Sequence, residues 1–220
     1  MPKKISDNQK PNIKVTAYYF TYLFVVWSLY RIYFNNTDAV DEFIVKPVVW
    51  LLPMFLLFGY QKLKLSDIGI TIKNFFPSVY LSLALGIGFV FLGLIANIAK
   101  YRGINFDANI GPDIFIYSIL ISFATSITEE LVFRGYFLTA FIRKYKNVTL
   151  SIFISSILWT LIHAPISYFV WGMSVSQIAV YLSLTFLYGV GSSILFLKTK
   201  NITSSVFLHV LWEWPIILFR

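Results

Sequence analysis

The sequence predicts an all-α fold, a polytopic membrane helix bundle of about seven transmembrane helices with a polar site inside the bundle. Of its 220 residues, 58% are apolar and only 13% are charged, whereas soluble domains carry about a quarter charged residues. Apolar runs of spanning length, roughly 17 to 25 residues, recur along the chain with short polar joints. These runs are continuous rather than alternating, which favours helices over a transmembrane barrel. No stretch is long or polar enough for a separate soluble domain, so we expect residues 1–220 to form one integral membrane domain.

The candidate spans follow one another along the whole chain. The first has no small-residue cleavage site after it, so we expect it to be retained rather than removed as a signal peptide. We expect Pro47 and Pro53 to kink the second, which a membrane helix tolerates. The fourth is longer than a bilayer requires and should tilt or protrude. The seven spans run roughly over Val15–Phe34, Phe43–Tyr60, Phe75–Ala99, Pro112–Ile142, Thr149–Pro165, Gln177–Leu197 and Ile202–Phe219.

The basic residues predict the orientation of the chain. With the N-terminus inside, twelve of the 18 Lys and Arg residues fall in inner segments. Five, Lys46 among them, fall in outer segments, and Arg134 lies within a span. This bias predicts a cytoplasmic N-terminus. Basic residues that flank apolar spans meet anionic lipid head groups, so we expect membrane lipids, and no nucleic acid, as partners. The abundance of Lys, Ile, Asn and Phe is typical of a low-GC bacterium, in which the membrane is the plasma membrane.

Six ionisable residues lie well inside the apolar spans. A charged group at mid-membrane costs about 2.5 to 3.5 kcal/mol on insertion scales, so such residues are functional candidates by default. The chain has only two histidines, and both belong to this set. It has no cysteine, which excludes disulfides, thiolate metal sites and cysteine catalysis. The six are Glu129, Glu130, Arg134, His163, His209 and Glu213.

The run from Glu129 to Arg134 divides into a structural part and a chemical part. Glu130 and Arg134 are four residues apart on one helix face, with the acid before the base, which is the favourable order for an ion pair. Glu129 lies about 100° away around the helix and has no obvious local partner. We therefore assign Glu130 and Arg134 to a structural ion pair, and Glu129 to proton transfer.

A glutamate with two histidines can do either of two kinds of chemistry. Glu129, His163 and His209 can bind a divalent metal such as zinc, which activates water. Alternatively, glutamate and one histidine activate water directly, while the other histidine polarises a carbonyl group. The residues alone leave this choice open.

Three motifs in this sequence resemble the CAAX protease and bacteriocin-processing family, also called the Abi family. The family has Glu-Glu-x-x-x-Arg, Phe-x-x-x-His and His-x-x-x-Asn or Asp on successive membrane helices. The first motif is complete in Glu129, Glu130 and Arg134. In the second, Trp159 replaces Phe before His163, and in the third, Glu213 replaces Asn or Asp after His209. The resemblance covers about residues 112–220.

The resemblance implies an intramembrane endopeptidase that acts on membrane-associated peptides or proteins. It implies that Glu129 and His163 activate water, that His209 and Glu213 stabilise the oxyanion, and that Trp159 shapes the pocket. Glutamate donates a hydrogen bond only when protonated, so Glu213 is a departure that bears on activity. The alternative is a non-catalytic bacteriocin-immunity or membrane partner protein of the same family.

Other readings of these residues fit less well. A rhomboid-type serine protease could use Ser192 or Ser193 with His209, but it leaves the glutamates unexplained. No aspartate lies well inside a span, which argues against an aspartyl protease, and the metalloprotease sequence His-Glu-x-x-His is absent. A transporter that couples protons through the buried glutamates remains a third possibility.

Overall fold

The structure, a computed structural model, describes residues 12–34, 36–61, 63–104 and 115–219, and every regular element in these ranges is a helix. The predicted all-α class is confirmed. The first half contains α1 (Ile13–Tyr33), α2 (Asp38–Val40), η2 (Asp41–Val45), η3 (Pro47–Leu51), α3 (Leu52–Gln61), η4 (Leu65–Ile68) and α4 (Phe75–Tyr101). The second half contains α5 (Phe115–Glu130), η5 (Leu131–Leu138), α6 (Thr139–Tyr145), α7 (Val148–Phe169), α8 (Val175–Thr199) and α9 (Ile202–Phe219).

Consecutive elements merge into longer rods that correspond to the predicted spans. The second rod, α2 to α3, begins at Asp38 rather than Phe43, and the fourth, α5 to α6, runs to Tyr145 rather than Ile142. Within the described residues, five helices are long and apolar enough to cross a membrane, while α1 and α9 are not among them. These five are Asp38–Gln61, Phe75–Ala99, Ile116–Tyr145, Val148–Phe169 and Val175–Thr199.

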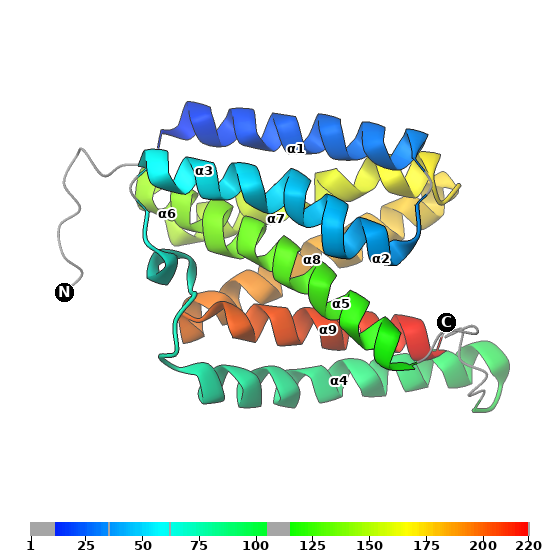
Figure 1. Cartoon of the computed structure of the whole chain (residues 1–220). Coiled ribbons are helices and arrows are strands. Elements are labelled where there is room, and N and C mark those ends of the chain that lie inside the picture. Colours follow the sequence, from blue (N-terminus) through cyan, green and yellow to red (C-terminus); the bar gives the residue numbers. More distant parts are fainter. Residues whose placement is uncertain (1–11, 35, 62, 105–114, 220) are drawn as a thin grey trace.

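The rods lie roughly side by side, with α1 along one edge of the bundle and α4 along the opposite edge (Figure 1). α4 packs against α9, and α7 packs against α8. The close approach of α4 and α9 requires Gly86, since a Cβ atom there would lie 2.2 Å from Leu211 Cδ1. A larger residue at this position would therefore push α9 outward.

The start of α9 is fixed by Asn201, which is fully buried. Its Nδ2 donates hydrogen bonds to the carbonyl oxygens of Thr71 at 2.8 Å and Lys73 at 2.9 Å. Further along, the carbonyl of Ser204 accepts a 2.7 Å hydrogen bond from Ser82 Oγ of α4. These contacts hold α9 in register with α4 and set the depth of the site residues that α9 carries.

The second rod changes its helical register around Pro47. Proline has no N–H group and cannot make the α-helical hydrogen bond to residue i−4. The backbone adopts two π-helical segments instead, in which the Lys46 N–H donates to the Asp41 carbonyl and the Leu52 N–H donates to the Pro47 carbonyl. We expected a kink at Pro47, and the structure has π-helical segments there. Such segments are frequent at functional sites.

The outer surface of the bundle is apolar, and its interior holds charged side chains among apolar ones. Large apolar side chains such as Leu56 and Leu187 are more than half exposed on the outer surface, as a lipid-facing surface requires. By contrast, Glu130 and Arg134 are completely buried, in the neighbourhood of the all-buried segment η5. Charged groups are therefore buried within the core of the bundle, beside apolar side chains.

Candidate active site

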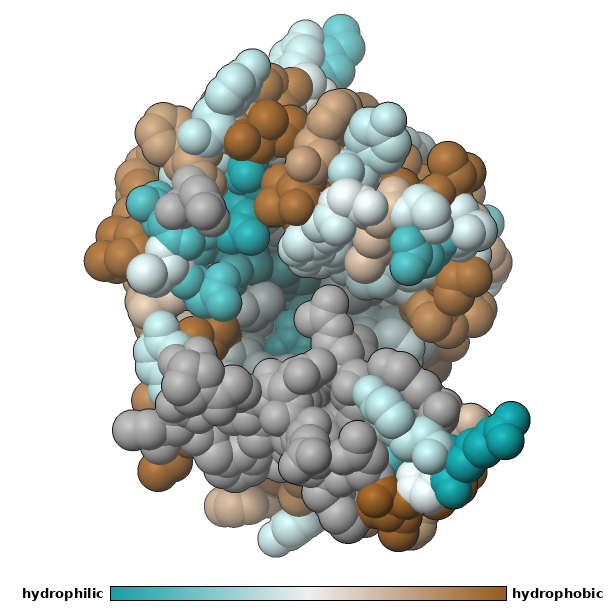
Figure 2. All heavy atoms as spheres, turned by 90° about the vertical axis from the view of Figure 1, so that its right-hand side faces the viewer, coloured by the Kyte–Doolittle hydropathy of each residue, from teal (hydrophilic) through white to brown (hydrophobic). Residues whose placement is uncertain are grey.

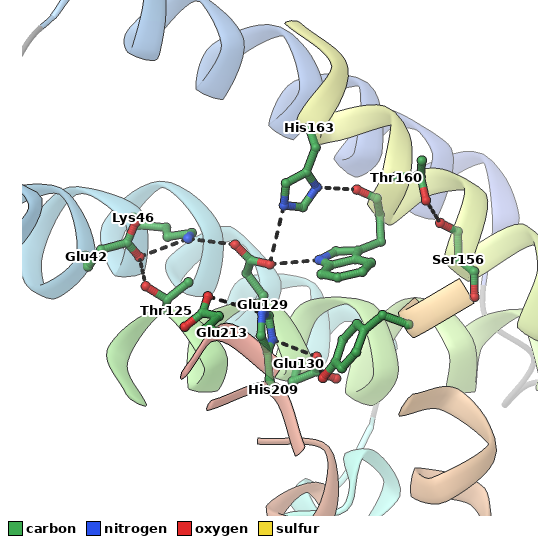
Figure 3. A network of polar contacts seen from close by, with 12 residues as sticks. Glu42, Lys46, Thr125, Glu129, Glu130, Ser156, Thr160, His163, His209 and Glu213 are labelled. Atoms are coloured by element: carbon green, nitrogen blue, oxygen red, sulfur yellow. Dashed lines mark hydrogen bonds and ion pairs between the residues drawn. The ribbon is translucent and has the colours of Figure 1, made fainter. Parts of the chain in front are cut away.

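The predicted site residues come together inside the bundle from three helices (Figure 3). His163 Nε2 lies 3.9 Å from Glu129 Oε2, and His209 Nε2 lies 3.5 Å from Glu213 Oε1. The indole ring of Trp159 contacts both histidine rings, with centroid distances of 5.0 and 5.6 Å. The fourth rod supplies Glu129, Glu130 and Arg134, α7 supplies Trp159 and His163, and α9 supplies His209 and Glu213.

Glu129 has two partners that hold different oxygens of its carboxylate. Oε1 accepts a 2.8 Å hydrogen bond from the ammonium of Lys46, and Oε2 accepts one of 2.8 Å from Trp159 Nε1. Glu129 has no partner on its own helix, as predicted, but it has these two partners on other helices. The indole of Trp159 donates a hydrogen bond to Glu129 that a phenylalanine at this position could not make.

The assignment of Lys46 to an outer segment is wrong. Its side chain is only 4% exposed, and its ammonium lies 2.9 Å from Glu42 Oε2 as well as 2.8 Å from Glu129. Glu42 in turn accepts a 2.8 Å hydrogen bond from Thr125 Oγ1. The sequence could have indicated this contact, because Lys46 lies inside the second predicted span, where a charged side chain needs a partner.

The ring of His163 has a defined orientation. Its Nδ1 lies 2.7 Å from the carbonyl oxygen of Trp159, and a carbonyl only accepts, so Nδ1 carries the hydrogen. In a neutral ring, Nε2 is then an acceptor, and it faces the Glu129 carboxylate at 3.9 Å, which is too long for a direct hydrogen bond. A water molecule that donates one hydrogen to each acceptor fits this separation.

Glu130 contacts four side chains and links Arg134 to His209. Its carboxylate lies 3.2 Å from Arg134 Nε, as the four-residue spacing predicted, and accepts a 2.9 Å hydrogen bond from His209 Nδ1. Hydroxyl groups of Tyr188 and Ser192 donate to the same carboxylate at 3.2 and 2.9 Å. The ion pair thus orients the His209 ring, a function beyond that expected of a helix-stabilising pair.

Arg134 makes contact mainly with aromatic faces. Its Nη1 and Nη2 atoms have no hydrogen-bond partner within the described residues, although the side chain is only 1% exposed. The guanidinium carbon lies 4.3 Å from the centroid of the Trp159 ring and 5.5 Å from that of Tyr188. Cation–π attraction to these two rings offsets part of the cost of the unpaired donors.

The serine-protease reading has no support in the geometry. Ser192 donates its hydroxyl hydrogen to Glu130, and Ser193 donates to the carbonyl of Gly189 at 2.7 Å. The Nδ1 atom of His209 is held by Glu130, and its Nε2 faces Glu213. Neither serine is arranged as a nucleophile beside a histidine base.

The arrangement does not fit a bound metal ion. In the part of the chain that the structure describes, no three His, Asp or Glu side chains are grouped so as to hold one. Both carboxylate oxygens of Glu129 already accept from Lys46 and Trp159. A divalent cation on this carboxylate would lie close to the Lys46 ammonium, and the two like charges would repel strongly in an apolar interior.

One end of the bundle is hollowed. Figure 2, which views the end where α1 finishes and α2 begins, shows a hollow with hydrophilic residues in its walls. The site residues His163 and Glu213 have side chains that are 15% and 25% exposed, the largest values among the predicted set.

Comparison with known families identifies the half of the chain that carries the motifs. The family described as type II CAAX prenyl endopeptidase Rce1-like matches residues 111–215. This range includes every predicted site residue, whereas Glu42 and Lys46 lie before it. Comparisons with curated proteins and with solved structures gave no match. The predicted resemblance to the CAAX proteases is thus confirmed: residues 111–215, just under half of the chain, are similar to the Rce1-like family.

Proposed function

We propose that this protein is an intramembrane endopeptidase that hydrolyses peptide bonds of membrane-associated peptides or proteins. The observation that carries the proposal is the pair of acceptors, Glu129 Oε2 and His163 Nε2, that face each other across 3.9 Å inside the bundle. Two acceptors at this separation orient a water molecule by both of its hydrogens. The match of residues 111–215 to the Rce1-like family supports the same class of reaction.

In the proposed reaction, Glu129 acts as general base. It takes a proton from the bound water while the water oxygen attacks the carbonyl carbon of the scissile bond, which gives a tetrahedral oxyanion. The same proton then passes to the amide nitrogen, the C–N bond breaks, and an acid and an amine leave. His163 holds the water through Nε2, because its Nδ1–H is engaged by the Trp159 carbonyl.

His209 is the proposed donor to the oxyanion. Glu130 accepts from its Nδ1, so a doubly protonated ring has Nε2–H free to donate toward the site. Donors fixed in advance at a developing negative charge make one of the largest contributions to catalysis. Glu213 lies 3.5 Å from Nε2 and contributes a donor of its own when protonated, which replaces the amide of the family motif.

The test is cleavage of membrane-anchored peptides by the purified protein in liposomes. Peptides with a variety of sequences next to the membrane are incubated with wild-type protein, and products are identified by mass spectrometry in ¹⁸O-labelled water. The proposal expects one ¹⁸O atom in the new carboxyl group, and a much slower release of product with Glu129→Gln. A well-folded wild-type protein that cleaves none of the peptides, yet protects cells against a bacteriocin, would instead indicate the non-catalytic immunity protein.

A chelator arm of the same assay tests the chemistry of the site. Because Lys46 occupies the Glu129 carboxylate, we expect EDTA and 1,10-phenanthroline to leave the rate of cleavage unchanged. A rate that falls with chelator and recovers on addition of zinc would contradict the direct activation of water by Glu129 and His163.

A further inference from the structure

We infer that Lys46, from the half of the chain that the family match does not cover, is a positioning residue that fixes the Glu129 carboxylate for proton transfer. The inference rests on the proposed function. None of the three motifs contains Lys46, and it lies 83 residues from Glu129 in the sequence. The two side chains nevertheless meet at 2.8 Å in the interior of the bundle.

The first support for this role is the division of contacts over the carboxylate. Lys46 holds Oε1, and Trp159 Nε1 holds Oε2, so the carboxylate can rotate only if one of two charge-assisted hydrogen bonds breaks. The remaining lone pair of Oε2 is then available on the side where His163 stands. Without Lys46, only the indole would restrain the carboxylate.

The second support is that Lys46 itself is held from several directions. Glu42 contacts its ammonium at 2.9 Å, and the centroids of the Trp27 and Trp50 rings lie 5.6 and 5.3 Å away. Thr125 of α5 in turn donates to Glu42 at 2.8 Å. A lysine without such contacts would keep its rotamer freedom, whereas these contacts restrict the Lys46 side chain to the conformation that reaches Glu129.

The third support is the backbone that presents the side chain. Lys46 stands between the π-helical segments η2 and η3, immediately before Pro47. Lys46 therefore leaves a segment of altered helical register and enters the bundle, where it meets Glu129 of the fourth rod. Helix irregularities of this kind carry a cost in stability and occur frequently at functional sites.

The experiment compares Lys46→Met with Lys46→Arg in the liposome assay, with Lys198→Met as the matched control. Lys198 is an exposed lysine near the end of α8 and belongs to none of the three motifs. We expect Lys46→Met to lower kcat about 100-fold, the loss typical of a displaced catalytic group, with KM unchanged. Lys46→Arg should recover much of the rate, because arginine also donates to a carboxylate. A raised KM with unchanged kcat would show that Lys46 binds substrate and would overturn the inference.

A second readout does not depend on catalysis. Dicyclohexylcarbodiimide labels carboxyl groups in apolar surroundings, and peptide mapping by mass spectrometry locates the labelled residue. We expect labelling of Glu129 in Lys46→Met, and none in wild type or in Lys198→Met, because the ion pair protects the carboxylate. Equal labelling in all three proteins would overturn the inference even if wild type cleaves peptides. Conversely, an inactive wild type with the expected labelling would refute the endopeptidase and leave the Lys46–Glu129 pair in place.

Discussion

Glu129→Gln should lower kcat for peptide cleavage by about 10²- to 10⁴-fold, the usual contribution of a general base. Glutamine has the same shape as glutamate and still accepts from the Trp159 indole, but it cannot take a proton from water. Lys46 keeps Glu42 at 2.9 Å as counter-ion, so the variant should remain folded. The measurement is the steady-state rate in liposomes, together with thermal unfolding followed by tryptophan fluorescence.

Asp38→Asn is the matched control for this exchange of carboxylate for amide. Asp38 is exposed at the start of the second rod and makes none of the contacts described for Glu129 or His163. Its substitution should change neither rate nor stability. If Glu129→Gln keeps a rate near that of wild type while both variants are folded, Glu129 is not the base, and water activation would have to begin elsewhere in the site.

The second large effect concerns stability. Glu130→Ala should lower the free energy of unfolding by about 3 to 5 kcal/mol, the cost of removing one partner of a buried ion pair. Arg134 is left with a buried charge, and two of its nitrogens already have no hydrogen-bond partner within the described residues. The variant should also be inactive, because His209 loses the acceptor that orients its ring. Unfolding in detergent with increasing denaturant measures the change.

A double variant separates the two consequences of this substitution. Apolar replacement of both partners of a buried ion pair is often neutral for stability. Glu130→Leu combined with Arg134→Met should therefore recover much of the stability of Glu130→Ala without recovering cleavage. If the double variant regains the rate of wild type, Glu130 has no part in holding His209, and the pair is structural alone.

The outcome for individual residues shows what local spacing can predict in a membrane protein. Glu130 and Arg134 lie four residues apart, so helix geometry alone predicted their contact, and the structure gives 3.2 Å. Likewise, hydrophobic runs predicted the rods that bring the motif residues into one layer. These predictions succeed because each depends on neighbours within one helix, or on the thickness of the bilayer.

Contacts between distant segments were not predictable in the same way. Lys46 lies near the outer end of its predicted span, where a basic residue ordinarily reaches the head groups, and it was therefore counted with the outer charges. Its burial depends on the π-helical register around Pro47 and on the packing of the second rod against α5. The orientation of the His163 ring likewise depends on a carbonyl that motif spacing does not reveal.

The double partnership of Lys46 has a consequence for the biogenesis of the protein. Since Glu129 follows 83 residues later, the second rod enters the bilayer before this partner has been synthesised. A lone lysine would oppose insertion by about 2.5 to 3.5 kcal/mol. Glu42, one turn earlier on the same rod, is available as a counter-ion from the moment that the helix forms. Glu42 therefore accompanies Lys46 through the translocon, and the arrival of the fourth rod adds Glu129 as its second partner.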